Sequence, residues 1–238
     1  MEKTKKIKIF IGLFYIVLVT LFLYFFFLKF SFQEITSYDF IKNNRDYFFE
    51  LRQSNLFLLS ILFILFTIIW VIAAGFGSPI AIFGGFIFGK WVGSLLVVLG
   101  LSIGATILYV FANYFLKDLI REKLLDKYQN LENKFKKSEF IYLLFFRFIG
   151  GIPFVIANIL PCIFNVKILN YFGATLIGLL PSIFIVCSVG SGLENIISEN
   201  LESPSLIELV TSKEIYLPII GFFILILASI FARKNFYS

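Results

Sequence analysis

Long apolar runs alternate with short charged segments along this chain of 238 residues, and that alternation limits the folds open to it. A helix of about 20 apolar residues is enough to cross a bilayer. Hydrophobic residues make up 59% of the chain and charged residues only 15%, whereas soluble domains average about 45–50% and about 25%. This composition argues against a soluble or a disordered protein and predicts an all-α polytopic membrane protein. The runs that we expect to span the membrane lie at 9–28, 56–74, 91–116, 168–192 and 217–232.

The charged segments divide the chain into four parts. The net charge of +6 gathers at the ends of apolar runs, which is typical of membrane anchoring and does not predict nucleic-acid binding. Four lysines within residues 1–8 predict a cytoplasmic N-terminus. The predicted parts are an uncleaved anchor (1–30), an interfacial amphipathic segment with an ordinary loop as the alternative (31–55), a membrane core (56–195), and an acidic loop with a C-terminal helix (196–238).

Two apolar segments are rich in glycine and proline. Because both residues disfavour helix interiors, and irregular backbone at membrane depth must be buried in protein or line a cavity, we expect re-entrant hairpins at about 75–90 and 139–166. A kinked helix is the alternative for the first segment. The residues expected to shape the hairpins are Gly77, Pro79, Gly84, Gly85 and Gly89 in the first and Gly150, Gly151, Pro153 and Pro161 in the second.

Each glycine-rich segment is followed by a full span, over 75–116 and again over 139–192. Paired interrupted segments in corresponding positions are typical of inverted repeats whose site lies where the two hairpins meet. The predicted fold is therefore two inverted units, each a re-entrant hairpin followed by a transmembrane helix, with flanking transmembrane helices. Gly93, Gly100 and Gly104 share one helix face and predict close approach of another helix there.

Arg147 is the clearest ionisable residue within these apolar regions. A charge inside a membrane is costly and points to function unless it only holds the fold, for example by binding hairpin carbonyls. Arginine stays charged and binds phosphate with two parallel hydrogen bonds, so a lipid phosphate would suit it. Lys90 is better explained as an interfacial residue whose ammonium reaches the headgroups.

The chain offers no visible apparatus for catalysis. It contains no His, and Cys162 and Cys187 lie 25 positions apart in apolar runs, which is not the spacing of metal ligands. No catalytic triad or phosphate-binding glycine loop is present. We therefore predict no enzyme activity, no metal and no cofactor.

Three stretches together resemble the VTT-domain family, whose members are also called SNARE-associated Golgi or DedA-like membrane proteins. They are 77–114, 146–166 and 172–193, and the likeness covers about 60–195 and looks closest to a yeast-Golgi-type branch with bacterial members. Arg147, Gly151, Pro153 and Asn158 match the second-hairpin motif, and the first-half glycines match as well. Two positions depart from the family: Asn113 stands where members often have arginine, and the first hairpin lacks the glutamate of the DedA-like branch.

The resemblance implies opposed re-entrant hairpins and movement of lipid, a phospholipid or a polyprenyl phosphate, between leaflets in support of membrane homeostasis. Arg147 would meet the phosphate, Asn158 the headgroup or the opposing hairpin, with Gly151 and Pro153 beside them. The alternatives are an ion- or proton-coupled solute transporter and an assembly factor that transports nothing. We expect a bacterial inner membrane, lipids as partners, and leave open whether the chain forms a homo-oligomer.

The predicted membrane topology conflicts with the distribution of positive charge along the chain. With the N-terminus inside and both hairpins re-entrant, the basic segment 117–138, predicted to be an amphipathic surface helix, falls outside. Cationic loops favour the cytoplasmic side. Removing one of the earlier crossings would resolve the conflict.

Overall fold

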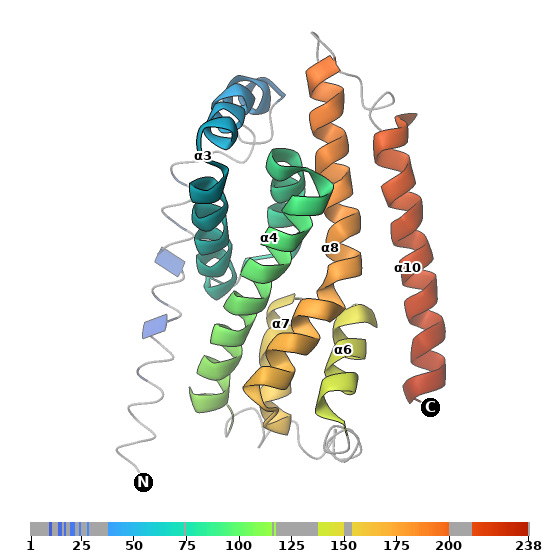
Figure 1. Cartoon of the computed structure of the whole chain (residues 1–238). Coiled ribbons are helices and arrows are strands. Elements are labelled where there is room, and N and C mark those ends of the chain that lie inside the picture. Colours follow the sequence, from blue (N-terminus) through green and yellow to red (C-terminus); the bar gives the residue numbers. More distant parts are fainter. Residues whose placement is uncertain are drawn as a thin grey trace.

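The computed structural model describes residues 38–73, 75–115, 117, 138–149, 154–199 and 211–237, with isolated positions between 10 and 28. Every regular element within these residues is a helix, and the helices form a bundle (Figure 1). Three stretches are long and apolar enough to cross a membrane: Arg45–Ile72, Gly77–Phe115 and Ile168–Ser198. The predicted helical membrane class is confirmed. The elements are α3 (Tyr38–Ile72), α4 (Gly77–Phe115), α6 (Glu139–Ile149), α7 (Phe154–Ile159), the 3-10 helix η1 (Leu160–Phe164), α8 (Ile168–Glu199) and α10 (Lys213–Tyr237).

α3 is interrupted at Asn55, whose backbone is extended (φ −155°, ψ 76°). The Asn55 side-chain oxygen accepts the Leu58 N–H at 2.9 Å and so caps the helix that follows. The helix before the kink is tied to the bundle by Arg52, which donates to the Ile87 carbonyl at 3.0 Å. It is tied again by Arg45, which pairs with Glu194 at 2.7 Å.

α4 reverses direction at Gly89, where φ is 76° and ψ is 169°. Residues other than glycine rarely adopt this backbone conformation. We call residues 77–88 the short arm and 90–115 the long arm. The two arms run antiparallel in close contact. A Cβ on Gly93 would overlap the Gly84 carbonyl, and Gly77 lies beside Leu101.

The expectation that Pro79, Gly84 and Gly85 break the chain is wrong, because the short arm is helical throughout. Pro79 lies in the first helical turn, where its missing N–H costs no intrahelical hydrogen bond. Gly84 and Gly85 instead allow close packing. A Cβ on Gly84 would lie 2.5 Å from Val97, and one on Gly85 would overlap the Cys187 carbonyl.

The part of α3 after the kink, residues 56–72, packs along the long arm. A Cβ on Gly100 would lie 2.7 Å from Thr67, and one on Gly104 would lie 2.8 Å from Val71, which confirms close helix approach at these glycines. α3 ends at Ile72, one residue beyond the Val71 contact, so it ends beside the middle of the long arm. The short arm then leads back in the opposite direction (Figure 1).

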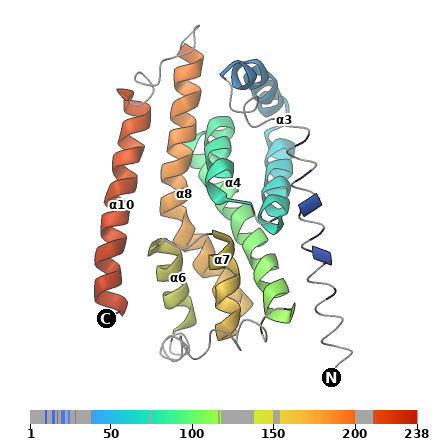
Figure 2. The same ribbon diagram turned by 180° about the vertical axis from the view of Figure 1, so that it is seen from behind.

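α6 packs against the first part of α8, and α7 packs against α4 (Figure 2). A Cβ on Gly173 would lie 3.2 Å from the Phe140 ring, and one on Gly178 would lie 2.6 Å from the Arg147 Cβ. η1 ends at Phe164, and the next residue, Asn165, adopts the left-handed conformation (φ 51°) before α8 begins. Gly89 and Asn165, the two positive-φ residues in the described part of the chain, each precede a long helix.

The centre of the bundle is the contact between α4 and α8. Gly190 lies against the Ile82 carbonyl, and Tyr109 stacks on Tyr171 with ring centroids 4.3 Å apart. Tyr109 also donates to the Val166 carbonyl at 2.6 Å. The outward faces remain apolar, as expected of a lipid-facing surface, with Leu169 83% and Phe57 76% exposed.

Several predictions lie outside the described residues. These are the roles of Gly150, Gly151 and Pro153, the amphipathic helix over 117–138 and most of the 1–30 anchor. Among the isolated positions near the N-terminus, Tyr15 hydrogen-bonds to the Ile72 carbonyl, and its ring centroid lies 5.0 Å from that of Phe111.

Candidate functional site

A cavity of about 300 Å³ lies where the start of the short arm meets the end of α6 and the start of α7. Gly77 and Leu101 place it beside the middle of the long arm of α4, and Leu179 to Val186 place it near the middle of α8. Its walls are mostly apolar, and Arg147 is the charged residue among them. The lining residues are Phe76, Gly77, Ser78, Leu101, Phe146, Arg147, Phe154, Ala157, Leu179, Ser182, Ile183 and Val186.

Arg147 lies in the last turn of α6 and is only 5% exposed. Gly178 of α8 provides the space for its Cβ. Its Nε donates to the Thr175 hydroxyl at 3.2 Å, and one terminal nitrogen, Nη2, donates to the Tyr171 hydroxyl at 2.5 Å. The guanidinium also lies 5.2 Å from the centroid of the Tyr171 ring and 6.0 Å from that of Phe154. α8 therefore holds the guanidinium through two hydroxyl groups and one aromatic face.

The other terminal nitrogen of Arg147, Nη1, is buried and has no hydrogen-bond partner among the described residues. The described ion pairs both belong to Arg45, so Arg147 has no carboxylate partner in this part of the chain. A buried unpaired cation costs several kcal/mol unless an anion or water reaches it. The cavity beside Arg147 is thus suited to an anionic group.

Backbone polarity favours the same sign of ligand. The N-terminus of the short arm opens at Gly77 and Ser78, both of which line the cavity. The first N–H groups of a helix lack intrahelical partners and carry partial positive charge. Together with the unpaired Nη1 of Arg147, they make the cavity electropositive within apolar walls.

Asn158 is not among the residues that line the cavity. Its side chain is completely buried on α7, and neither of its amide atoms has a hydrogen-bond partner among the described residues. Its backbone carbonyl accepts the Tyr171 hydroxyl at 3.1 Å. Tyr171 therefore links Asn158 to Arg147 and fixes α7 relative to α6.

The remaining predicted residues divide between this site and the scaffold. Gly77 lines the cavity, whereas Pro79 is exposed, Gly84 and Gly85 are packed against neighbouring helices, and Gly89 forms the turn. Pro161 is buried in η1. Sequence reasoning missed Tyr171, Thr175 and Ser182, because a hydroxyl in an apolar helix carries no local signal of its partner.

The fold and a family model together define the class of this protein. Its fold is a helical membrane bundle with a buried arginine at a central cavity. Residues 75–192 match the VTT domain family model, so this chain belongs to the VTT-domain family.

Curated relatives support this membership. YqeD of Bacillus subtilis, described as uncharacterized, is 31% identical over 114 residues, which are 47% of this chain and 55% of that protein. Transmembrane protein 41 homologs of Dictyostelium discoideum and Caenorhabditis elegans are 27% and 26% identical over 138 and 136 residues. These matches cover 55% and 54% of this chain, and 41% and 55% of the relatives, so the chain spans about half the length of the relatives it matches. No solved structure matches this chain.

Proposed function

We propose that this protein moves lipids with a phosphate headgroup between the two leaflets, and that the phosphate passes through the cavity at Arg147. The observation that carries the proposal is that Arg147 lines a mostly apolar cavity at the middle of the bundle, while its buried Nη1 has no hydrogen-bond partner among the described residues. A planar guanidinium can bind a phosphate through two hydrogen bonds. Family membership supports a role in membrane homeostasis, and the proposed activity involves no chemical conversion.

We further propose that the bundle consists of two inverted units. The first comprises residues 56–115, in which the second part of α3, ending at Ile72, and the short arm, beginning at Gly77, form a re-entrant hairpin. The second comprises residues 139–199, in which α6 and α7 form the other hairpin. Positive-φ residues at Gly89 and Asn165 before the two long helices, and a cavity where the hairpin ends meet, support this arrangement.

This reading of α3 also supports a definite orientation in a bacterial inner membrane. If residues 56–72 form half of a hairpin, one crossing is removed and the basic segment 117–138 returns to the side of the N-terminus. Lys117 hydrogen-bonds to Asn165 at 2.9 Å, so the end of α4 and the turn before α8 lie at the same end of the bundle. We assign this end to the cytoplasm because cationic loops are retained there.

The ion-coupled alternative needs a carboxylate within the membrane. The described part of α4 and all of α6, α7 and η1 beyond Glu139 contain no acidic residue, and Glu194 on α8 is paired with Arg45. These observations favour lipid movement over ion-coupled transport. The non-transporting alternative is an outcome of the experiment that follows.

The test is a leaflet-exchange assay with the purified full chain in sealed liposomes that contain a fluorescent phospholipid. A membrane-impermeant reductant bleaches the labelled lipid in the outer leaflet. Loss of more fluorescence than the outer leaflet holds reports exchange between the leaflets. We expect Arg147→Gln to lower the exchange rate at least tenfold. Arg147→Lys should retain part of the parental rate, because lysine keeps the charge but cannot form two parallel hydrogen bonds to the phosphate. Arg52→Gln, a matched change outside the cavity, should exchange lipid as the parent does.

Two results would contradict the proposal. Parental exchange by a folded Arg147→Gln protein would remove the phosphate role of Arg147. No exchange by the parent, with either a phospholipid or a polyprenyl phosphate as the labelled lipid, would favour the assembly-factor function instead.

A further inference from the structure

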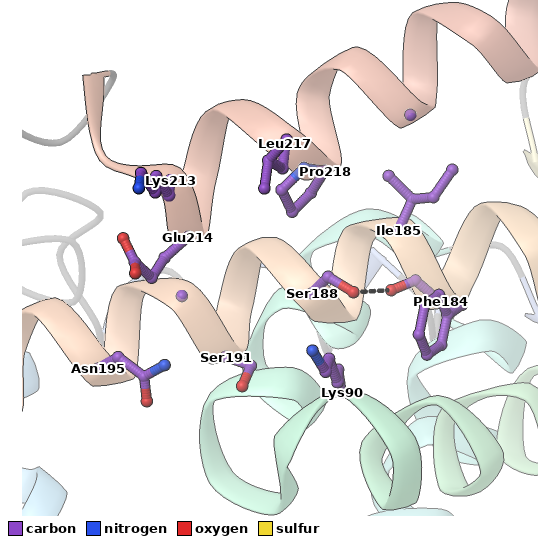
Figure 3. Close-up of a pocket in the computed structure, with 12 residues that line it drawn as sticks. Lys90, Phe184, Ile185, Ser188, Ser191, Asn195, Lys213, Glu214, Leu217 and Pro218 are labelled. Atoms are coloured by element: carbon purple, nitrogen blue, oxygen red, sulfur yellow. Dashed lines mark hydrogen bonds between the residues drawn. The ribbon is translucent and has the colours of Figure 1, made fainter.

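A second and larger pocket, of about 540 Å³, lies between α8 and α10 near the Gly89 turn of α4 (Figure 3). It shares no lining residue with the Arg147 cavity. Its volume falls in the range of small-molecule sites, about 300–1,000 Å³. The lining residues are Lys90, Phe184, Ile185, Ser188, Ser191, Gly192, Asn195, Lys213, Glu214, Leu217, Pro218 and Gly221.

The pocket changes from polar to apolar along its length. A Cβ on Gly192 would lie 2.5 Å from the Glu214 carbonyl oxygen, which places the start of α10 beside the polar residues of α8. Gly221, further along α10, lies beside Ile185, with 3.8 Å between its Cβ position and the Ile185 Cδ1. The outer end therefore holds Ser191, Asn195, Lys213 and Glu214, and the inner end holds Phe184, Ile185, Leu217 and Pro218.

The pocket as a whole is lined by two lysines, Lys90 and Lys213, and one glutamate, Glu214, which give it a net charge of +1. Lys90 comes from the turn of α4 and lies opposite the face of α8 that bears Ser188 and Ser191 (Figure 3). Neither lysine forms an ion pair in the part of the chain that the structure describes. A group with one negative charge and several oxygen acceptors would complement the two ammonium groups and the neighbouring hydroxyls.

The depth of the pocket matches the headgroup layer. Trp91, next to Lys90, is 69% exposed, and its ring centroid lies 4.8 Å from that of Phe184 in the pocket wall. Exposed tryptophan beside lysine at the end of an apolar helix is typical of the membrane interface. A ligand in this pocket would thus have its polar part at the interface and its apolar part toward the membrane interior.

We propose that this pocket is a resident binding site for a glycerophospholipid of the leaflet at the Lys90 end of the bundle. The phosphate lies between Lys90 and Lys213, and the acyl chains follow the groove between α8 and α10 past Gly221. The site is separate from the transfer cavity, so it can be occupied whether or not the protein moves lipid.

Native mass spectrometry of the detergent-purified full chain tests the site, with every variant built on Arg147→Gln so that the central cavity does not contribute. The probes are dioleoyl phosphatidylglycerol, dioleoylglycerol, which lacks phosphate, and glycerol 3-phosphate, which lacks chains. We expect binding of the phospholipid, and at least tenfold weaker binding of either partial probe.

Two independent changes should weaken phospholipid binding. The double change Lys90→Gln and Lys213→Gln removes both ammonium groups that line the pocket, and we expect at least a tenfold loss. Gly221→Leu fills the apolar end without altering charge, and we expect a loss of similar size. Lys167→Gln, an exposed lysine at the other end of the bundle, should change binding less than twofold.

Three outcomes would overturn the proposal. If the double variant binds the phospholipid as Lys167→Gln does, the lysines do not form a site. Equal binding of dioleoylglycerol would mean that the groove binds acyl chains without recognising the phosphate. Equal binding of glycerol 3-phosphate would identify a site for a free phosphate ester and not for a lipid.

Discussion

The short arm of α4 and the α6–α7 region both pack through glycine, yet the glycines serve different purposes. In the short arm they bring backbone against backbone, as where Gly85 lies on the Cys187 carbonyl. Beside α6, Gly178 of α8 makes room for the base of a charged side chain, Arg147. The short arm contains no ionisable residue, whereas the α6–α7 region holds the buried cation. A glycine pattern thus predicts close packing, and the charge beside it marks the candidate site.

The largest expected effect breaks the packing of the short arm. Gly85→Val places side-chain atoms on the Cys187 backbone, which cannot move as a flexible side chain could. Overpacking typically costs about 1–3 kcal/mol, and backbone overlap should reach or exceed the upper end. We expect low yield and a clearly lower melting temperature in detergent. Gly221→Ala, whose Cβ would have only an ordinary 3.8 Å contact, should melt with the parent.

The turns before the two long helices allow a finer comparison. Gly89 has a φ of 76° and a ψ of 169°, a region that is nearly restricted to glycine, so Gly89→Ala should cost about 1–3 kcal/mol. Asn165→Gly should cost less, because asparagine in the left-handed region can be replaced by glycine without steric strain. Thermal unfolding of both variants in the same detergent measures the difference. Equal melting temperatures would show that the backbone at residue 89 can adopt another conformation without loss of stability.

The helical membrane class and the site arginine were predictable because each rests on a local signal. Apolar runs of membrane length indicate spans directly, and one arginine in such a run is conspicuous. The partners of that arginine were not predictable. Tyr171 and Thr175 are 24 and 28 residues away from Arg147 in sequence. Both lie in an apolar helix, where nothing in the neighbouring sequence indicates that they contact an arginine.

The position of the chain reversal was also beyond the sequence. The glycine and proline content predicted a hairpin somewhere within 75–90 but not where it turns, and Gly84 and Gly85 stay helical and pack against neighbouring helices. The reversal falls at Gly89, and nothing in the sequence distinguishes that glycine from the others. The point at which α3 ends, beside the middle of the long arm of α4, likewise depends on tertiary contacts and was not predictable from the sequence.

Tyr171→Phe sharpens the comparison from the α6–α7 side. The change removes the acceptor for one Arg147 nitrogen and the donor to the Asn158 carbonyl, and it leaves the ring stack on Tyr109 in place. Lost hydrogen bonds to a buried charged group predict a destabilisation of about 1–2 kcal/mol. Lipid exchange should fall less than with Arg147→Gln, because the cation remains. A larger loss of exchange than in Arg147→Gln would make the tyrosine, and not the arginine, the main ligand group.

The smallest expected effect concerns the hydrogen bonds between the first residue of α6, Glu139, and the start of α8. One carboxylate oxygen of Glu139 accepts the Lys167 N–H at 3.1 Å and the Asn170 amide at 2.8 Å. Glu139→Gln keeps one acceptor oxygen of the same shape, so it weakens both bonds without deleting them and should cost about 1 kcal/mol or less. Glu139→Ala removes the acceptor and should cost more. Because neither change touches Arg147 or the short arm, lipid exchange per folded protein should stay at the parental rate. A loss of exchange in Glu139→Gln at unchanged melting temperature would mean that α6 must be held in register at its start for Arg147 to act at its end.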